Sequence, residues 1–598
     1  MKQTTWRTID DLLRCVAEST ANTPDAKEGI ARGDAIGTSM PQLRITYDSG
    51  CQTSKALSAV YRMLARGDEK QEAARHSDAR EQENERVILI CADATAAHAY
   101  PKDVCAQTIT DVAFRLVVKS GIAKASMRGD RLLDENEQDV LLEDMKVTGL
   151  KPRRLKEMLK FFYRCMSDTT NETDGWMVSA EEEMVYSILI ENLEARQALL
   201  PWEVSSFAYK GLTRMQRSDR TIVVVDDYGA FDAASQRLVR ELGNAGFFAT
   251  GSTIAARCAA IEHPCFEGFD ALGSAMPTVH FDGKVSMPNK ETTTFDTPRA
   301  EFEAVAESIA HSKEGSVLVA TPNDTWSASI ACALERHGVP YEMIERPRKV
   351  KGDPRLSDKN SALRQAALAK LSANPSDQVA LRSWIGLDDW LLRSDAYAEL
   401  LKQHREGGKS ISEMLGQIAA GTDGDDIPPI ARTKFREPLQ QLRSALDAAQ
   451  EGMITQPNST EASKATPGDT EQGIADTINQ ANKELNSDPH PRVIIATYPL
   501  CHGIHVDHVF ATGLVDGFLP HLDAVDDKHS IDHRGKALDR DHTLLRDVES
   551  CARVSVSRSL FRCDLLSNAD LLDMNIERIY MHESKHFARI APSRFVCA

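Results

Sequence analysis

The run Thr221–Asp227, which reads Thr-Ile-Val-Val-Val-Asp-Asp, constrains the fold of this chain more strongly than its other segments. Its four central residues are apolar and β-branched, without the alternation of polar and apolar positions that a half-exposed strand shows, so they are typical of a strand buried on both faces. Ligand sites of open parallel sheets lie at the carboxyl ends of the strands. We therefore expect a central parallel strand that carries Asp226 and Asp227 to a site at the edge of a sheet.

Two helical stretches interrupt a series of similar β-prone runs. Apolar residues recur at helical spacing from 131 to 210, and residues 355–447 are again mainly helical. Shorter helices are expected at 233–242 and 326–337. This order predicts an α/β protein with two parallel-sheet cores, each with a helical insertion. The further strands are expected at 43–47, 87–91, 247–250, 316–321, 492–497 and 507–513.

The octet Ser49–Ala56 (Ser-Gly-Cys-Gln-Thr-Ser-Lys-Ala) stands between an expected strand and a helical pattern, which is the position of a phosphate-binding loop. In such a loop, glycines let backbone N–H groups close on the phosphates, a lysine reaches the β- and γ-phosphates, and a hydroxyl binds Mg²⁺. Lys55 stands where the lysine is needed, but two serines replace glycines and Ala56 has no oxygen for the metal. The helical face that follows the octet consists of Leu57, Val60, Tyr61 and Leu64.

Composition limits the classes of partner. The 598 residues contain no apolar run of the roughly 20 residues that span a bilayer, and the N-terminus opens no apolar signal core, so we predict a cytoplasmic protein without a membrane partner. The formal net charge of −18 argues against a broad nucleic-acid-binding surface, although a narrow basic groove is compatible with it.

In their order along the chain, these segments resemble the motifs of the UvrD/PcrA/Rep-type superfamily 1 DNA helicases. The clearest match is 494–510, which resembles the family's T-x-H-x-x-K-G-L-E-x-D-x-V-F, and 513–520 follows as a glycine-led strand that ends in x-G-x-x-P. The strand end 223–236 resembles V-D-E-x-Q-D. The resemblance extends from about residue 41 to the C-terminus, and its other matches are 49–56, 106–116, 248–252, 317–323, 338–341 and 592–595.

The resemblance implies two RecA-like P-loop cores of parallel strands, each with a helical insertion. The first core is expected at 1–110 and 206–280, with its insertion at 111–205. The second core is expected at 281–350 and 491–598, with an insertion and a mobile linker at 351–490.

The resemblance also implies ATP and Mg²⁺ as cofactors and single-stranded or partly duplex DNA as a partner. It makes Asp226 a metal ligand, and Asp226 and Asp227 the catalytic carboxylates. The implied cofactor-binding residues are Ser49, Gly50, Thr53, Ser54 and Lys55, and the implied nucleic-acid-binding residues are Thr108, Thr110, Thr497 and His502.

Several positions depart from the family pattern. Asp227 stands in place of the catalytic glutamate, and Thr321 and Cys551 stand where arginines would contact the γ-phosphate. Loss of one such arginine typically lowers the rate of phosphoryl transfer by about 10³–10⁵. Our hypothesis is a helicase-like protein that keeps ATP and DNA binding but has impaired or lost hydrolysis and unwinding.

Two alternatives stay open. One is an active ATP-dependent 3′–5′ DNA helicase, and therefore an ATP hydrolase, in DNA repair. The other is a non-catalytic scaffold that binds a protein partner in a repair complex. The polar segment 450–490 is interpreted as a mobile linker, and Trp384 and Trp390 are interpreted as core residues of the second helical insertion.

Overall fold

A computed structural model gives the fold. It describes residues 4–6, 12–17, 40–47, 56–65, 85–92, 96–97, 100, 103–215, 220–251, 263–281, 289–312, 315–344, 350–407, 409–422, 424, 427–450, 493–501, 504, 506–525, 530–561, 563–567, 583–584, 587–590 and 593–597. The chain divides into two compact units. The first comprises Met1–Val112, Gln216–Arg346 and Ile474–Ala598, and the second comprises Ala113–Met215 and Pro347–Gly473.

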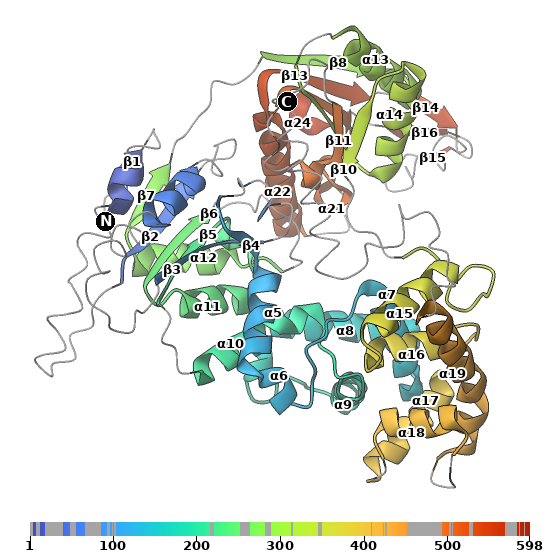
Figure 1. Ribbon diagram of the computed structural model, residues 1–598. Coiled ribbons are helices and arrows are strands. Elements are labelled where there is room, and N and C mark those ends of the chain that lie inside the picture. The colour runs from blue at the N-terminus through green and yellow to red at the C-terminus, as the bar shows by residue number, and fades with distance from the viewer. Residues whose placement is uncertain are drawn as a thin grey trace, which may run out of the picture. The chain divides into compact units, whose positions relative to one another are not determined.

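A seven-stranded sheet in the first unit contains the strand with the acid pair (Figure 1). Its order is β1-β7-β2-β6-β5-β3-β4, and all of its neighbouring strands are parallel. One strand, β6, separates β2 from β5. The strands are β1 (Thr4–Trp6), β2 (Gln42–Tyr47), β3 (Glu85–Cys91), β4 (Ala106–Thr108), β5 (Arg220–Val225), β6 (Gly246–Gly251) and β7 (Thr278–Phe281).

Helices cover this sheet and complete its core. Residues 56–65 are helical, and the expected apolar face of this helix packs in one core cluster with residues of β2, β3 and β5, which confirms the pattern read from the sequence. β5 is buried from Thr221 to Val225, as a strand covered on both faces requires. The other helices next to this sheet in the chain are α5 (Ile109–Ser120), α11 (Ala233–Leu242) and α12 (Phe266–Ala275).

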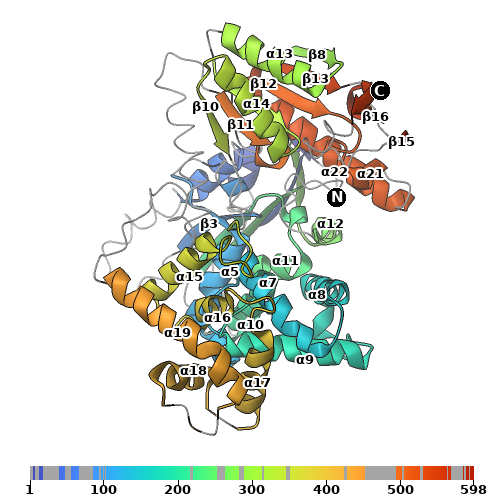
Figure 2. The same cartoon turned by 90° about the vertical axis from the view of Figure 1, so that its right-hand side faces the viewer.

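A second parallel sheet, also in the first unit, has six strands in the order β10-β11-β9-β12-β13-β8. Val317 and Val319 of β9 pack in one core cluster with residues of α13 and α14, and Leu318 and Ala320 pack in another with residues of α22. The sheet therefore lies between α14 and α22 (Figure 2). The elements are β8 (Asn289–Phe295), α13 (Pro298–His311), β9 (Val317–Thr321), α14 (Asp324–Arg336), β10 (Tyr341–Ile344), β11 (Val493–Thr497), β12 (Val506–Leu514), α21 (Leu522–Val525), α22 (Ile531–Ser550) and β13 (Ala552–Phe561).

A small antiparallel sheet, which the sequence analysis does not predict, comes after β13. It consists of β14 (Cys563–Ser567), β16 (Phe587–Ile590) and β15 (Glu583–Ser584), in the order β14-β16-β15. The helix α24 (Arg594–Cys597) follows it.

The second unit is helical and combines both helical stretches of the chain. Capping boxes define the starts of α7, α9 and α18, where Asp134, Ser179 and Ser410 each accept a backbone N–H of the first turn. α7 of the first stretch contacts α16 and α17 of the second. The helices are α6 (Ile122–Ala125), α7 (Glu135–Asp144), α8 (Pro152–Ser167), α9 (Ala180–Ala195), α10 (Val204–Arg214), α15 (Ser361–Ala373), α16 (Gln378–Gly386), α17 (Ser394–Arg405), α18 (Ile411–Ala420) and α19 (Pro429–Gln450).

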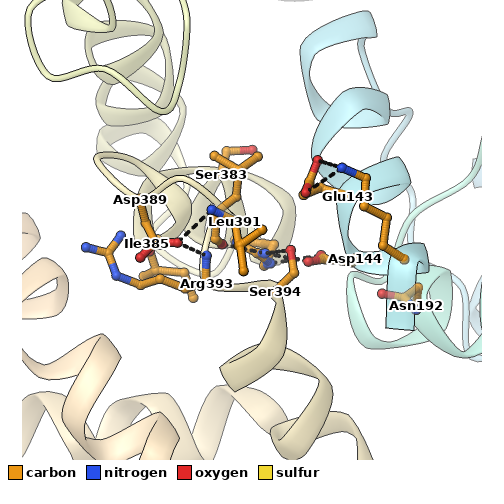
Figure 3. A network of polar contacts seen from close by, with 12 residues as sticks. Glu143, Asp144, Asn192, Ser383, Ile385, Asp389, Leu391, Arg393 and Ser394 are labelled. Atoms are coloured by element: carbon orange, nitrogen blue, oxygen red, sulfur yellow. Dashed lines mark hydrogen bonds and ion pairs between the residues drawn. The ribbon is translucent and has the colours of Figure 1, made fainter. Parts of the chain in front are cut away.

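A buried ionic cluster joins the two helical stretches. Arg382 of α16 donates to both carboxylate oxygens of Asp144, from Nε at 2.9 Å and from Nη2 at 2.5 Å, and Arg196 binds the same carboxylate. These three side chains are at most 2% exposed. Both guanidinium groups lie over the ring of Tyr397, at 4.6 and 5.0 Å from its centroid. Figure 3 shows Asp144 of the first stretch facing Ser394 of the second.

The structure confirms the expected α/β class with two parallel sheets. The interpretation of the two tryptophans is correct for Trp384, which is 3% exposed and donates from Nε1 to the carbonyl of Pro438. It is wrong for Trp390, which is 73% exposed, because the loop from Leu387 to Arg393 turns its indole toward solvent. The expected linker at 450–490 lies, apart from Gln450, outside the described residues. Among the described helices, none is both long enough and apolar enough to cross a membrane.

Candidate functional site at the carboxyl edge of the first sheet

The acid pair lies directly after β5, at the carboxyl edge of the first sheet. Asp226 is 2% exposed and Asp227 is 3% exposed. Asp227 adopts the left-handed conformation, with φ 53° and ψ 56°, and a 3₁₀ turn at Tyr228–Ala230 follows it. Aspartate tolerates this conformation better than most residues, and such backbone outliers occur often at ligand sites.

Thr250, the neighbouring residue on β6, holds the backbone of the pair. Its hydroxyl donates to the carbonyl of Val225 at 3.2 Å and accepts the N–H of Asp227 at 3.2 Å. The same hydroxyl oxygen lies 3.5 Å from Oδ1 of Asp226. Thr250 therefore satisfies the backbone where β5 turns out of the sheet, a place where buried peptide groups otherwise lack ladder partners.

Two buried tyrosines bind the carboxylates themselves. The hydroxyl of Tyr100 donates to Oδ2 of Asp226 at 2.7 Å, and the hydroxyl of Tyr47 donates to Oδ1 of Asp227 at 3.2 Å. Each tyrosine is 4% exposed. Hydrogen bonds to a charged group contribute about 1.5–3 kcal/mol each, so these phenols fix both carboxylates in place.

Tyr47 also relates the acid pair to the candidate phosphate loop. It is the last residue of β2, the strand that leads into the octet 49–56. Ser49, Gly50, Thr53, Ser54 and Lys55 lie outside the described residues. Ala56, the last position of the octet, is described: it is 2% exposed and belongs to the core cluster of the first sheet.

The implied nucleic-acid-binding residues occupy separate places. Thr108 ends β4, is 4% exposed, and accepts the N–H of Asp111 at 3.0 Å, so its hydroxyl caps the start of α5. Thr110 lies in the first turn of α5 and is partly exposed. Thr497 ends β11 of the other parallel sheet and is partly exposed, and His502 lies outside the described residues. Thr108 thus belongs to the sheet of the acid pair, Thr110 lies in the helix that directly follows its strand, and Thr497 belongs to the other parallel sheet.

Uncharged, buried groups occupy the two positions where the resemblance places arginines. The hydroxyl of Thr321 is fully buried, lies 2.6 Å from that of Ser327 and donates to the carbonyl of Ala496 at 3.3 Å. Cys551 is 3% exposed, and its thiol lies 3.3 Å from the carbonyl of Cys501. Burial raises the pKa of the Cys551 thiol well above its usual value, so this thiol is neutral.

The carboxyl edge of the second sheet is fixed by its own polar contacts. Oε1 of Glu301, a fully buried residue of α13, accepts the N–H of Gly513 at 2.7 Å. Burial raises the pKa of this carboxyl to about 8. Arg594 forms a two-nitrogen ion pair with Oδ2 of Asp516, at 3.0 and 2.8 Å, and the hydroxyl of Ser593 donates to the carbonyl of Leu519 at 2.6 Å. The C-terminal segment therefore anchors the loop that follows β12.

The donor set around Asp226 does not fit the Mg²⁺ that the resemblance implies. Carboxylate oxygens are suitable ligands, but Mg²⁺ requires near-octahedral geometry and usually keeps several waters. Asp226 is almost fully buried, one of its oxygens is bound by Tyr100, and Ala56 supplies no oxygen. Within the described ranges, no group of three or more His, Cys, Asp or Glu side chains is placed to hold a metal ion.

Sequence reasoning identified the carboxylates but missed the three side chains that hold them: Tyr47, Tyr100 and Thr250. Tyr47 and Thr250 carried a usable signal, because each stands at or near the end of an expected parallel strand, where polar groups converge. Tyr100 carried no such signal, since it follows β3 in a segment without regular pattern.

Comparison with known proteins adds no relative to this picture: the chain matches no protein-family model and no curated protein.

Proposed function

We propose that this chain is a helicase-like protein that binds ATP at the carboxyl edge of the first sheet and binds single-stranded or partly duplex DNA, with impaired or lost ATP hydrolysis. In this proposal the two parallel sheets are RecA-like cores, and Lys55 contacts the phosphates. The matched motif order of the sequence supports the lineage, and the acid pair supports the location of the nucleotide.

The observation that carries the proposal is the hydrogen bond between Tyr47 and Asp227. A phosphate loop can serve an acid pair when both leave the same edge of one parallel sheet. Tyr47 is eight residues before Lys55 and bonds to Asp227 across β6. The chain therefore enters the candidate loop beside the acid pair.

Weak hydrolysis is supported by three buried groups. A general base must reach the attacking water, whereas Asp227 is 3% exposed and accepts a hydrogen bond from Tyr47. Thr321 and Cys551 are uncharged and buried, so neither supplies the positive charge that phosphoryl transfer needs. Together these substitutions favour a nucleotide-binding protein over the active helicase.

Calorimetric titration of the full chain with ATP tests the nucleotide site. We expect saturable binding that Lys55→Ala weakens by at least about tenfold, because a lysine on the phosphates contributes a charge-assisted bond. Lys124→Ala is the matched control, since this lysine is 71% exposed and pairs with Asp130 in the helical unit. If Lys55→Ala and Lys124→Ala bind ATP with equal affinity, Lys55 does not contact the phosphates and the proposed site is wrong.

Fluorescence anisotropy of labelled oligonucleotides tests the DNA part. We expect affinity for single-stranded DNA that falls as the salt concentration rises, because phosphate contacts release counterions. Strand separation in ATP should not exceed that of Lys55→Ala. Unwinding that depends on Lys55 would establish the active helicase instead, and a lack of salt-dependent DNA binding would favour the protein-binding scaffold.

A further inference from the structure

We propose that the acid-pair site binds its nucleoside triphosphate without a divalent metal ion. This inference rests on the proposed nucleotide-binding function and adds that the site does without the Mg²⁺ that the resemblance implies. It comes from three described residues, Ala56, Asp226 and Asp227, and from the two tyrosines that contact the carboxylates.

The chain lacks the hydroxyl that binds Mg²⁺ in a phosphate loop. In a phosphate loop, the Ser or Thr after the lysine supplies an oxygen to Mg²⁺. Here that position is Ala56, which is 2% exposed and packs in the core cluster with Leu57 and Val60. A buried apolar residue thus occupies the place where a metal ligand would stand.

Tyrosine hydroxyls already bind both carboxylates of the acid pair. To bind a metal through Oδ2, Asp226 would have to release the hydroxyl of Tyr100, which lies 2.7 Å away. That release would leave a buried phenol, on a side chain that is 4% exposed, without this partner, and an unsatisfied buried donor is costly. Asp227 is bound in the same way by Tyr47.

The negative charge of Asp226 affects nucleotide binding in opposite directions with and without a metal ion. Where Mg²⁺ lies between a carboxylate and the phosphates, the carboxylate strengthens nucleotide binding through the metal. Without the metal, the two negative groups repel each other. Neutralising Asp226 must therefore weaken a metal-dependent site and strengthen a metal-free one.

Calorimetric titration with ATP, once in Mg²⁺ and once in EDTA, distinguishes the two cases. We expect dissociation constants that agree within about threefold. Asp226→Asn should bind ATP several-fold more tightly than the parent chain in EDTA, because its amide oxygen still accepts from Tyr100 while the negative charge is gone. Affinity that requires Mg²⁺ and falls in Asp226→Asn would overturn this inference and leave the proposed function standing. Absence of ATP binding in both buffers would remove the proposed function and this inference together.

Two further variants act on the residues that exclude the metal, and both keep the test decisive if Asp226→Asn does not fold. Ala56→Ser places a hydroxyl oxygen at the position of Ala56, and Tyr100→Phe removes the phenol hydrogen bond to Oδ2 of Asp226, so each should make ATP binding tighter in Mg²⁺ than in EDTA. Tyr61→Phe is the matched control, because Tyr61 is 9% exposed and belongs to the same core cluster as Tyr100. If neither Ala56→Ser nor Tyr100→Phe acquires a response to Mg²⁺, the assigned cause of metal-free binding is wrong.

Discussion

Nη2 of Arg382 lies 2.5 Å from Oδ1 of Asp144, although the two residues are 238 positions apart and belong to different helical stretches of the chain. Arg196 binds the same carboxylate, so two guanidinium groups share one counter-charge in a cluster that is almost closed to solvent. Further contacts stabilise the excess positive charge: both guanidinium groups lie over the ring of Tyr397, and they donate to the carbonyls of Leu392 and Asn192. The two chain segments of the second unit are therefore held together as one folded body.

Asp144→Asn should destabilise this unit by about 3–5 kcal/mol, because two buried guanidinium groups would lose their only shared counter-charge among the described contacts. Hydrogen exchange measures the effect separately in 113–215 and 347–450, and we expect both segments to lose protection together. Glu157→Gln is the control: it breaks an exposed ion pair with Arg153, which is worth about 0.3–0.5 kcal/mol. Loss of protection in one segment alone would contradict a single body.

Glu301 should make the stability of the second sheet depend on pH. Its folded pKa of about 8 lies above the ordinary 4.5, so its contribution is fully present below pH 4.5 and is lost as the pH rises toward 8. The loss amounts to roughly 4–5 kcal/mol, since each pKa unit corresponds to 1.36 kcal/mol.

Glu301→Gln stays neutral and can still accept the N–H of Gly513, so it should remove this part of the pH dependence. Hydrogen exchange of β9 and β12 in denaturant, followed at several pH values, measures this pH dependence of stability. Glu303→Gln, two positions along α13, is the control, because Glu303 is 37% exposed and pairs with Arg336. Equal pH profiles of Glu301→Gln and the parent chain would show that Glu301 is ionised in the folded protein.

Local sequence patterns predicted those elements whose burial depends on their own residues. β5 could be recognised because four of its five successive buried positions form an apolar run, and the helix at 56–65 because its core face repeats at helical spacing. The contacts of the acid pair could not be recognised in this way. Tyr47 and Tyr100 lie 180 and 126 positions from their carboxylates. Tyr47 meets Asp227 through the strand order of the sheet, and Tyr100 meets Asp226 from the segment after β3, and local periodicity encodes neither.

The exposure of Trp390 shows the same limit in a loop. The interpretation of Trp390 as a core residue is wrong because the backbone of this loop decides where the indole points. Asp388, Leu392 and Arg393 all have positive φ angles, from 50° to 63°. Non-glycine residues seldom adopt this region, so a sequence reading does not anticipate three of them around one tryptophan.

Replacement of the two tryptophans by alanine should therefore give unequal results. Trp384→Ala should cost about 3–5 kcal/mol, because it removes a buried indole and its hydrogen bond to Pro438. Trp390→Ala should cost less than about 1 kcal/mol, which covers its contact with the guanidinium of Arg355 at 5.9 Å. Thermal unfolding of the helical unit measures both changes in stability. A similar loss of stability in the two variants would place Trp390 in the core after all.

Thr250→Val tests whether the backbone at the end of β5 depends on a side chain of β6. Valine has nearly the same shape but leaves the buried N–H of Asp227 and the carbonyl of Val225 without the hydroxyl that now serves both, so we expect a loss of about 1–3 kcal/mol. Thr293→Val, on the exposed edge strand β8, should change stability by less than about 0.5 kcal/mol. Chemical denaturation followed by hydrogen exchange of β5 and β6 provides the measurement. Unchanged stability of Thr250→Val would show that the backbone at the end of β5 does not depend on the hydroxyl of Thr250.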